Sequence, residues 1–394
     1  MKIKVGVFFG GKSVEHEISI ITANQAISSI NREKYEIIPI YISKNGKMYT
    51  GEKLFDLREY KDLNNLIKSL EEITCVNNGE TVNILRVNNK LFGSNVLNSI
   101  DVAFPIMHGT NGEDGSIQGY LEILGIPYVG PDVLASSIGM DKIMMRRLLK
   151  EQNIPSLDYV AFYSLEYIKN EEKYINEIEE KLTYPVIVKA GNLGSSVGIK
   201  KAKNKEELKE AIEFSMEFSD RVMVENAIVK LKEINCSVLG DMIDAKASIL
   251  EEPIGSDEIL SYTDKYVGSS KTKGSGSKGM ASLQRKVPAE IPEDIANKIK
   301  EIAIKTFKVL GCNGVSRIDF MIDMETDEIY VNEINTIPGA LSYYLWENTG
   351  KKFEEELDDL IDLAFKRNRE RKNRTYSYDQ NILALGNGIK GVKK

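Results

Sequence analysis

The hydrophobic and polar positions of this chain alternate in blocks that predict strands and helices in turn. Short apolar runs at 2–11 and 35–43 flank a stretch at 13–30 whose apolar residues recur at helical spacing. Two strands joined by one helix are typical of a parallel βαβ unit, because parallel neighbours need a crossover connection. We therefore expect the chain to begin with a parallel-sheet α/β domain.

The same kinds of block continue along the chain. An apolar strand at 100–109 ends in glycine and precedes a helix at 115–125. Further helices are predicted at 141–154, 205–218 and 294–311, and further strands at 184–190, 221–228, 233–241, 245–252, 314–323 and 328–335. The strands at 233–252 are expected to form an antiparallel pair and those at 314–335 a hairpin.

Three segments stand out by their polarity. Residues 159–182 are charged and predict an exposed helical segment. Residues 366–394 are basic and poor in apolar periodicity, which indicates a solvated tail. The glycine-, serine- and lysine-rich loop at 268–280 is longer than compact domains usually contain without a functional reason.

Composition narrows the class of protein. A chain of 394 residues is long enough for two or three domains. Its net charge of −7 argues against general nucleic-acid binding, which requires a basic surface. The three cysteines form no C-x-x-C pair, as is typical of reduced thiols. The first apolar run is too short for a signal sequence or a membrane span, so we expect a cytoplasmic protein without membrane insertion.

The hairpin at 314–335 carries candidate chemistry. Glu333 and Asn335 share one face of a strand that is otherwise apolar. If the hairpin turns at 325–327, Asp319 lies opposite Glu333 and Arg317 lies opposite Asn335. Hard oxygen ligands without nearby His or Cys suit Mg²⁺. A structural ion-pair network of Arg317 with the two carboxylates is an equally good interpretation of the hairpin alone.

Two other features are ambiguous by themselves. Lys189 ends a strand and precedes the loop "GNLGSSVG", whose backbone N–H groups could bind phosphate oxygens, although a plain hairpin loop is the simpler alternative. The chain has only two histidines, His16 and His108. A lone histidine at a strand end is more often a structural group than a catalyst.

Six motifs that are weak separately become specific in combination. They are "GGKSVEHEISI", "HGTNGEDGSIQGYLEILGIPYVGP", "MDK", "KAGNLGSSVGI", "RIDF" and "VNEINTIPG". In this order and spacing they resemble the D-alanine–D-alanine ligases, a family with the ATP-grasp fold. The resemblance covers residues 1 to about 350.

The resemblance implies a fold class and a division into domains. The fold is expected to be α/β, with an ATP-grasp fold preceded by a Rossmann-like parallel α/β N-terminal domain. The expected boundaries are 1–128 for the N-terminal domain, 129–226 for the central ATP-grasp subdomain, 227–370 for the C-terminal subdomain with a lid loop at about 260–282, and 371–394 for the basic tail.

The resemblance also implies which residues form the functional site. Nucleotide contacts are expected from Lys142, Lys189, Ser196, Glu225, Ala227, Glu233 and Lys265. Groups that act on the reacting substrates are expected to be Glu15, Ser195, Tyr266, Arg317 and Gly339, with His108 and Ser342 near the substrate carboxylates. Metal ligands are expected to be Asp319, Glu333 and Asn335.

The implied reaction is the ATP-dependent joining of two D-alanines through an acyl phosphate, for peptidoglycan precursors. Two Mg²⁺ ions, with Mn²⁺ as a substitute, and a homodimer are expected. Two alternatives stay open: a ligase with another acceptor, such as D-serine, and a catalytically silent nucleotide-binding relative. The segment Pro338–Trp346 is shorter than the serine-bearing loop usual in the family, which leaves the acceptor site and the role of Ser342 less defined.

Overall fold

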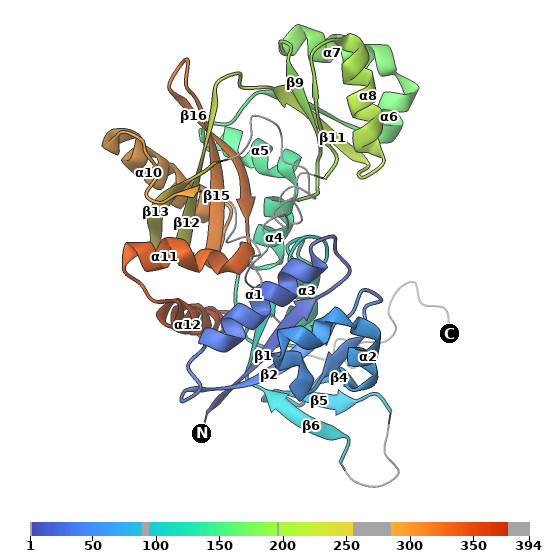
Figure 1. Cartoon of the computed structure of the whole chain (residues 1–394), viewed down its shortest axis with the longest axis vertical. Helices are drawn as coiled ribbons and strands as arrows, with labels where there is room; N and C mark the ends of the chain where they lie inside the picture. The colour runs from blue at the N-terminus through green and yellow to red at the C-terminus, as the bar shows by residue number, and fades with distance from the viewer. Residues whose placement is uncertain (1, 89–93, 195–196, 255–284, 377–394) are drawn as a thin grey trace, which may run out of the picture.

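The computed structural model describes residues 2–88, 94–194, 197–254 and 285–376. It contains three sheets, each in its own part of the chain (Figure 1). The N-terminal unit lies at the bottom of Figure 1 in blue, the central unit at the top in green, and the C-terminal unit beside them in orange and red. No helix within the described ranges is long and apolar enough to cross a membrane.

The N-terminal sheet has seven strands in the order β6-β5-β4-β3-β2-β1-β7. Its strands are β1 (Ile3–Gly10), β2 (Tyr35–Ile42), β3 (Met48–Thr50), β4 (Glu71–Asn77), β5 (Val82–Arg86), β6 (Val96–Ile100) and β7 (Val102–Ile106). β1 pairs in parallel with β2 and β7, and α1 (His16–Ser29) connects β1 to β2. The predicted βαβ unit is therefore confirmed, and β2 to β6 extend the sheet with antiparallel pairs.

Short helices complete this unit and lead to the next. They are η1 (Glu52–Phe55), η2 (Leu57–Lys61), α2 (Leu63–Lys68), α3 (Ser116–Ile123), α4 (Val133–Met140) and α5 (Lys142–Glu151). Asp141 accepts hydrogen bonds from the backbone N–H groups of Ile143 and Met144 and so caps α5. This cap fixes Lys142 at the first position of the helix.

The central sheet is antiparallel, in the order β10-β9-β11-β8. It consists of β8 (Tyr159–Tyr163), β9 (Val186–Ala190), β10 (Ile199–Ala202) and β11 (Arg221–Asn226), with α6 (Ser164–Lys169), α7 (Glu171–Lys181) and α8 (Lys205–Met216) packed on it.

The prediction for residues 159–182 is wrong at its start and in its exposure. The segment begins with strand β8, which pairs with β11. Its helices bury Tyr167, Ile175 and Ile178 in the core of this unit. The charged residues lie on the opposite helix faces and dominated the sequence pattern, whereas the alternation in "YVAFY" is that of a half-buried strand.

The C-terminal sheet has the order β14-β13-β12-β15-β16. Its elements are β12 (Leu231–Gly240), β13 (Ala245–Pro253), β14 (Arg285–Lys286), β15 (Gly314–Asp323) and β16 (Glu328–Asn335), followed by η4 (Gly339–Ser342), α11 (Tyr343–Thr349) and α12 (Phe353–Lys372). The amphipathic α10 (Glu293–Val309) buries Ile299, Ala303 and Phe307 against the sheet. The predicted antiparallel pair and hairpin are both confirmed.

The basic C-terminal segment is not a solvated tail throughout. Its first residues, 366–372, are the last turns of α12. Arg367 donates hydrogen bonds to the carbonyl oxygens of Tyr128 and Gly130 and lies 4.2 Å from the centre of the Tyr128 ring. Arg371 pairs with Glu122 at 2.7 Å. The charges that suggested a tail therefore bind the N-terminal unit, and residues 377–394 lie outside the described part of the chain.

Candidate active site

A cavity of about 350 Å³ lies where the three units meet. The N-terminal unit contributes Glu15, His108 and Glu113 to its wall. The central unit contributes Lys189, Glu225 and Ala227, and the C-terminal unit contributes the inner face of its sheet together with Gly339 and Tyr344. Twelve of the sequence-predicted residues line the cavity: Glu15, His108, Lys142, Lys189, Glu225, Ala227, Glu233, Arg317, Asp319, Glu333, Asn335 and Gly339. Glu113 also lines it and was not predicted.

A row of polar side chains crosses the C-terminal sheet along the cavity. Asn235 of β12 pairs with Glu251 of β13 on one side and with Asp319 of β15 on the other. Asp319 in turn pairs with Glu333 of β16. Directly paired residues share a face of the sheet. The row therefore presents three carboxylates and one carboxamide to a single cavity.

The predicted register of the hairpin is confirmed. Asp319 lies opposite Glu333, and Arg317 lies opposite Asn335. Arg317 donates from Nε and Nη2 to the two carboxylate oxygens of Asp319 at 2.6 and 2.7 Å, and Asn335 Nδ2 donates to Asp319 Oδ2 at 3.0 Å. This bidentate pair is one part of the ion-pair network of Arg317 with both carboxylates that the sequence offered as an alternative to a metal site.

The same residues nevertheless fit Mg²⁺. Burial raises the pKa of Asp319 even beside Arg317, and the negative charge of the nearby Glu333 raises it further. Two carboxylates and a carboxamide oxygen leave room for phosphate and water oxygens, as Mg²⁺ prefers. Within the described ranges, no cluster of three His, Cys, Asp or Glu side chains forms a metal site made by protein alone. The donor set thus fits a metal that arrives with phosphate.

Two lysines lie at the Glu333 end of the row or next to it. Lys142 Nζ pairs with Glu333 Oε2 at 3.2 Å and donates to the carbonyl oxygen of Leu193 at 2.7 Å. Lys189 Nζ pairs with Glu225 Oε1 and donates to Asn332 Oδ1 at 3.0 Å. Both lysines are buried, so each is a strong local charge for a phosphate group.

The predicted nucleotide residues Glu225, in β11, and Ala227, just after it, have other partners in this structure. Glu225 is buried between Lys189 and Arg146, whose Nη2 lies 3.0 Å from Glu225 Oε2. Ala227 donates its backbone N–H to the carbonyl oxygen of Pro185 at 2.9 Å. Both still line the cavity, as does Glu233.

Glu15 lies against two glycine loops. A Cβ atom added to Gly109 would lie 2.6 Å from Glu15 Oε2, and one added to Gly194 would lie 3.4 Å from the same oxygen. Gly109 has φ of +68°, which also favours glycine. The N-terminal acid and the glycine-rich loop, far apart in sequence, therefore meet at one wall of the cavity.

His108 links the N-terminal unit to the segment after β16. Its Nδ1 lies 2.8 Å from the carbonyl oxygen of Ile337, which can only accept, so Nδ1 carries the proton. Its Nε2 lies 3.0 Å from Thr22 Oγ1. Burial lowers the pKa of His108 to about 4, so the ring is neutral at pH 7.

Glu113 was not singled out from the sequence, although it belongs to the motif "HGTNGEDG". It accepts hydrogen bonds from the backbone N–H groups of Gly109 and Ile337, both at 2.9 Å. Burial first, and then the nearby Glu15, raises the pKa of Glu113 to about 8. Asn235, Glu251, Arg285, Asn332 and Tyr344 were missed as well. No local pattern identifies these residues, because the register of the sheet and, for Tyr344, the placement of α11 bring them to the cavity.

Some predicted residues are not at the cavity or cannot be placed. Ser342 is fully buried and is not among the residues that line the cavity. Ser195, Ser196, Lys265 and Tyr266, together with the predicted lid at 260–282, lie outside the described residues. Their roles stay predictions.

Three units around a cavity lined by lysines and carboxylates define an ATP-grasp ligase. Sequence comparison gives the family. The family model described as "D-ala D-ala ligase N-terminus" matches residues 4–131, and the one described as "D-ala D-ala ligase C-terminus" matches residues 148–362. The chain belongs to the D-alanine–D-alanine ligase family.

Individual proteins agree with this assignment. A D-alanine–D-alanine ligase of Thermosipho melanesiensis is 42% identical over 385 residues, which is 97% of this chain and 99% of that protein. Among solved structures, a D-alanine–D-alanine ligase from Coxiella burnetii has a TM-score of 0.77 at 29% identity, covering 94% of this chain and 96% of that one. A D-Ala:D-Ser ligase from Enterococcus faecalis has a TM-score of 0.75 at 34% identity, covering 92% of this chain and all (100%) of that one.

Proposed function

We propose that this chain joins two molecules of D-alanine into D-alanyl-D-alanine, a building block of peptidoglycan precursors, with the conversion of ATP to ADP and phosphate. The observation that carries the proposal is the convergence of Glu15, Lys142, Arg317 and Glu333 on one cavity in a chain that matches the family over nearly its full length. A silent relative would have no chemical reason to keep all four.

The first step activates a carboxylate. A carboxylate is a poor acyl donor, so one carboxylate oxygen of the donor D-alanine attacks the γ-phosphorus of ATP. An oxygen–phosphorus bond forms, the bond to ADP breaks, and an acyl phosphate results. Lys142 and Lys189 are placed to offset the negative charge on the transferring group. Mg²⁺, when held by Asp319, Glu333 and Asn335, supplies further charge neutralisation there.

The second step forms the peptide bond. The amine of the acceptor attacks the acyl carbon, a carbon–nitrogen bond forms, phosphate leaves, and the amine loses a proton. The tetrahedral intermediate carries an oxyanion, for which Arg317 and the backbone N–H of Gly339 are the proposed donors. Glu15 is the proposed partner of the donor's ammonium group. We assign nucleotide contacts to Glu225, Ala227 and Glu233.

Finer features belong to the same proposal. The family resemblance supports two Mg²⁺ ions per site, a homodimer and a cytoplasmic location, where ATP is available. It also supports a lid at 260–282 that keeps water from the acyl phosphate.

The test is a product assay on the full chain with ATP, Mg²⁺ and D-alanine. We expect one ADP and one phosphate for every D-alanyl-D-alanine identified by mass spectrometry, and no dipeptide when L-alanine replaces D-alanine. ATP turnover without dipeptide contradicts the proposal. A mixed dipeptide that forms faster with D-serine than D-alanyl-D-alanine forms would instead favour the alternative acceptor.

A further inference from the structure

We propose that Arg285 binds the carboxylate of the acceptor D-alanine, and that Glu251 and Tyr344 hold its guanidinium in place for this purpose. The inference rests on the proposed function, because it concerns the second substrate of that reaction. It assigns a specificity-determining role to a residue that no sequence motif marks.

The acceptor needs a partner for its charge. An amino-acid acceptor carries a carboxylate into a site that excludes water, where an unpaired charge is costly. The family resemblance of the sequence motifs implies Ser342 for this group. In the structure, however, Ser342 is 0% exposed and does not line the cavity. Another donor has to serve the acceptor.

Among the described residues that line the cavity, the basic ones are Lys142, Lys189, Arg285 and Arg317. The two lysines lie with Glu333 and Glu225 at the nucleotide side. Arg317 forms its bidentate pair with Asp319 and is assigned to the oxyanion. Arg285 alone lies at the opposite end of the polar row, beside Glu251.

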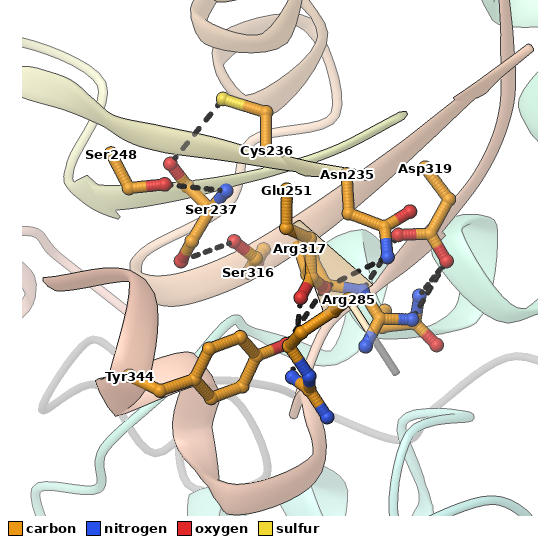
Figure 2. Close-up of polar contacts among 11 residues, drawn as sticks. Asn235, Cys236, Ser237, Ser248, Glu251, Arg285, Ser316, Arg317, Asp319 and Tyr344 are labelled. Carbon is orange, nitrogen blue, oxygen red and sulfur yellow. Dashed lines mark hydrogen bonds and ion pairs between the residues drawn. The ribbon is translucent and has the colours of Figure 1, made fainter. Parts of the chain in front are cut away.

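Three elements converge to hold this end of the cavity (Figure 2). Tyr344 of α11 donates its hydroxyl to Glu251 Oε1 at 2.7 Å, and Asn235 of β12 donates to the same oxygen at 2.9 Å. Arg285 of β14 donates from Nη1 to Glu251 Oε2 at 3.1 Å, and its guanidinium lies 4.3 Å from the centre of the Tyr344 ring. Glu251 is buried, whereas the Arg285 side chain is 21% exposed. A fixed carboxylate thus positions a guanidinium that still reaches the cavity.

The place of this cluster suits an acceptor. Tyr344 follows the Gly339 segment by one short turn, and Arg317 lies beside the polar row that leads from Glu333 to Glu251. The row crosses four neighbouring strands, so its two ends lie three strand spacings, or about 14 Å, apart. The donor carboxylate and phosphate belong at the Glu333 end, so an amino acid that attacks from the other side extends toward Arg285. A planar guanidinium also matches a carboxylate better than an ammonium does.

The experiment compares two acceptors that differ only at the carboxylate. D-alaninamide keeps the amine and the methyl group of D-alanine but lacks the negative charge, and its product is distinguished by mass from D-alanyl-D-alanine. In Arg285→Gln we expect kcat/KM for D-alanine as acceptor to fall roughly 10- to 100-fold, as for loss of a charge-assisted hydrogen bond. We expect kcat/KM for D-alaninamide to change less than twofold, and the KM values for ATP and for the donor D-alanine to stay unchanged.

Matched variants distinguish the proposed role of Arg285 from a general loss of structure. Lys286→Gln removes the neighbouring positive charge, which pairs with Glu290 outside the cavity. This variant should leave kcat/KM unchanged for both D-alanine and D-alaninamide. Tyr344→Phe keeps the ring but removes the hydroxyl bond to Glu251, so we expect a smaller loss that is again confined to D-alanine. Arg285→Lys should restore part of the discrimination between the two acceptors.

Equal losses for D-alanine and D-alaninamide in Arg285→Gln would overturn the inference and make the cluster a structural one. The same conclusion would follow if Arg285→Gln does not fold and Tyr344→Phe affects both acceptors alike. Failure of the wild-type chain to make any dipeptide would instead refute the proposed function, so the two failures are distinguishable.

Discussion

At the scale of single residues, the two carboxylates of the hairpin have different basic partners. Asp319 is paired with Arg317, whereas Glu333 is paired with Lys142 from another element. The sequence allowed either a metal site or one ion-pair network of Arg317 with both carboxylates. The observed pairing is intermediate, because Asp319 forms the bidentate pair with Arg317 while Glu333 has a cationic partner on another element, Lys142. A substitution at Glu333 therefore distinguishes the two interpretations.

We predict that Glu333→Gln lowers kcat by about a hundredfold or more, since a bound metal provides several kcal/mol of transition-state stabilisation. The free energy of unfolding should change by less than about 1 kcal/mol, because the side chain of Glu333 is 29% exposed and an amide keeps its shape. Kinetics over a range of Mg²⁺ concentrations and urea unfolding measure both quantities.

Glu328→Gln, at the exposed start of β16, is the control and should leave both quantities unchanged. A Glu333→Gln protein with normal turnover, or one whose main defect is lost stability, would favour the structural ion pair.

His108 gives a prediction for pH. Its pKa is lowered to about 4 by burial in the folded protein and is about 6.5 in the unfolded chain. A group with a lowered folded pKa stabilises the fold above the unfolded pKa, and this stabilisation is lost as the pH falls. We expect the free energy of unfolding to decrease by on the order of 3 kcal/mol between pH 6.5 and 4 from this residue.

Denaturant unfolding at several pH values of the wild type and of His108→Gln tests this. The variant should show a shallower loss of stability over the same pH range. His16, whose pKa burial also lowers, is present in both proteins, so the difference reports on His108. Identical slopes would exclude His108 as a source of the acid sensitivity.

At the scale of elements, the long periodic segments could be predicted and the short ones could not. The patterns at 13–30 and 294–311 correspond to α1 and α10, because each repeats over several helical turns. α10 buries one face, whereas α1 is buried on most of its sides. The short antiparallel strands β3 to β6 carry too few residues for a periodic signal, and they depend on pairing within the sheet. β8 was missed because the charged helices that follow it dominated the pattern.

The end of α12 also shows that a local sequence pattern does not reveal contacts with a distant part of the chain. Its basic residues suggested solvent exposure, but Arg367 and Arg371 find partners on the N-terminal unit that no local pattern reveals. We predict that Arg367→Ala destabilises the protein by about 2–4 kcal/mol, because it leaves two carbonyl oxygens without a donor and removes a cation–π contact. Arg369→Ala, on the exposed side of the same helix, should cost less than about 0.5 kcal/mol.

Thermal and urea unfolding of the two variants give these values. If Arg367→Ala is as stable as Arg369→Ala, α12 does not secure the N-terminal unit.

At the scale of the whole molecule, the cavity exists only because three units meet. Its residues range from Glu15 to Tyr344 in sequence. The motifs could identify most of the acidic and basic residues, because these residues lie within motifs that occur in the order and spacing of the family. They could not identify Glu251, Arg285 or Tyr344, because these side chains meet only through the register of β12 to β14 and the placement of α11. The reaction type could therefore be inferred from the sequence, whereas the proposed acceptor end of the cavity could be recognised only from the fold.

The central claim is that a carboxylate is activated by phosphoryl transfer and then captured by an amine. Its most direct test uses D-alanine labelled with ¹⁸O in the carboxylate, together with unlabelled ATP and water. If the donor carboxylate attacks ATP, one labelled oxygen leaves with the phosphate for each dipeptide formed, and mass spectrometry of the phosphate shows it. Dipeptide formation with unlabelled phosphate would contradict the account.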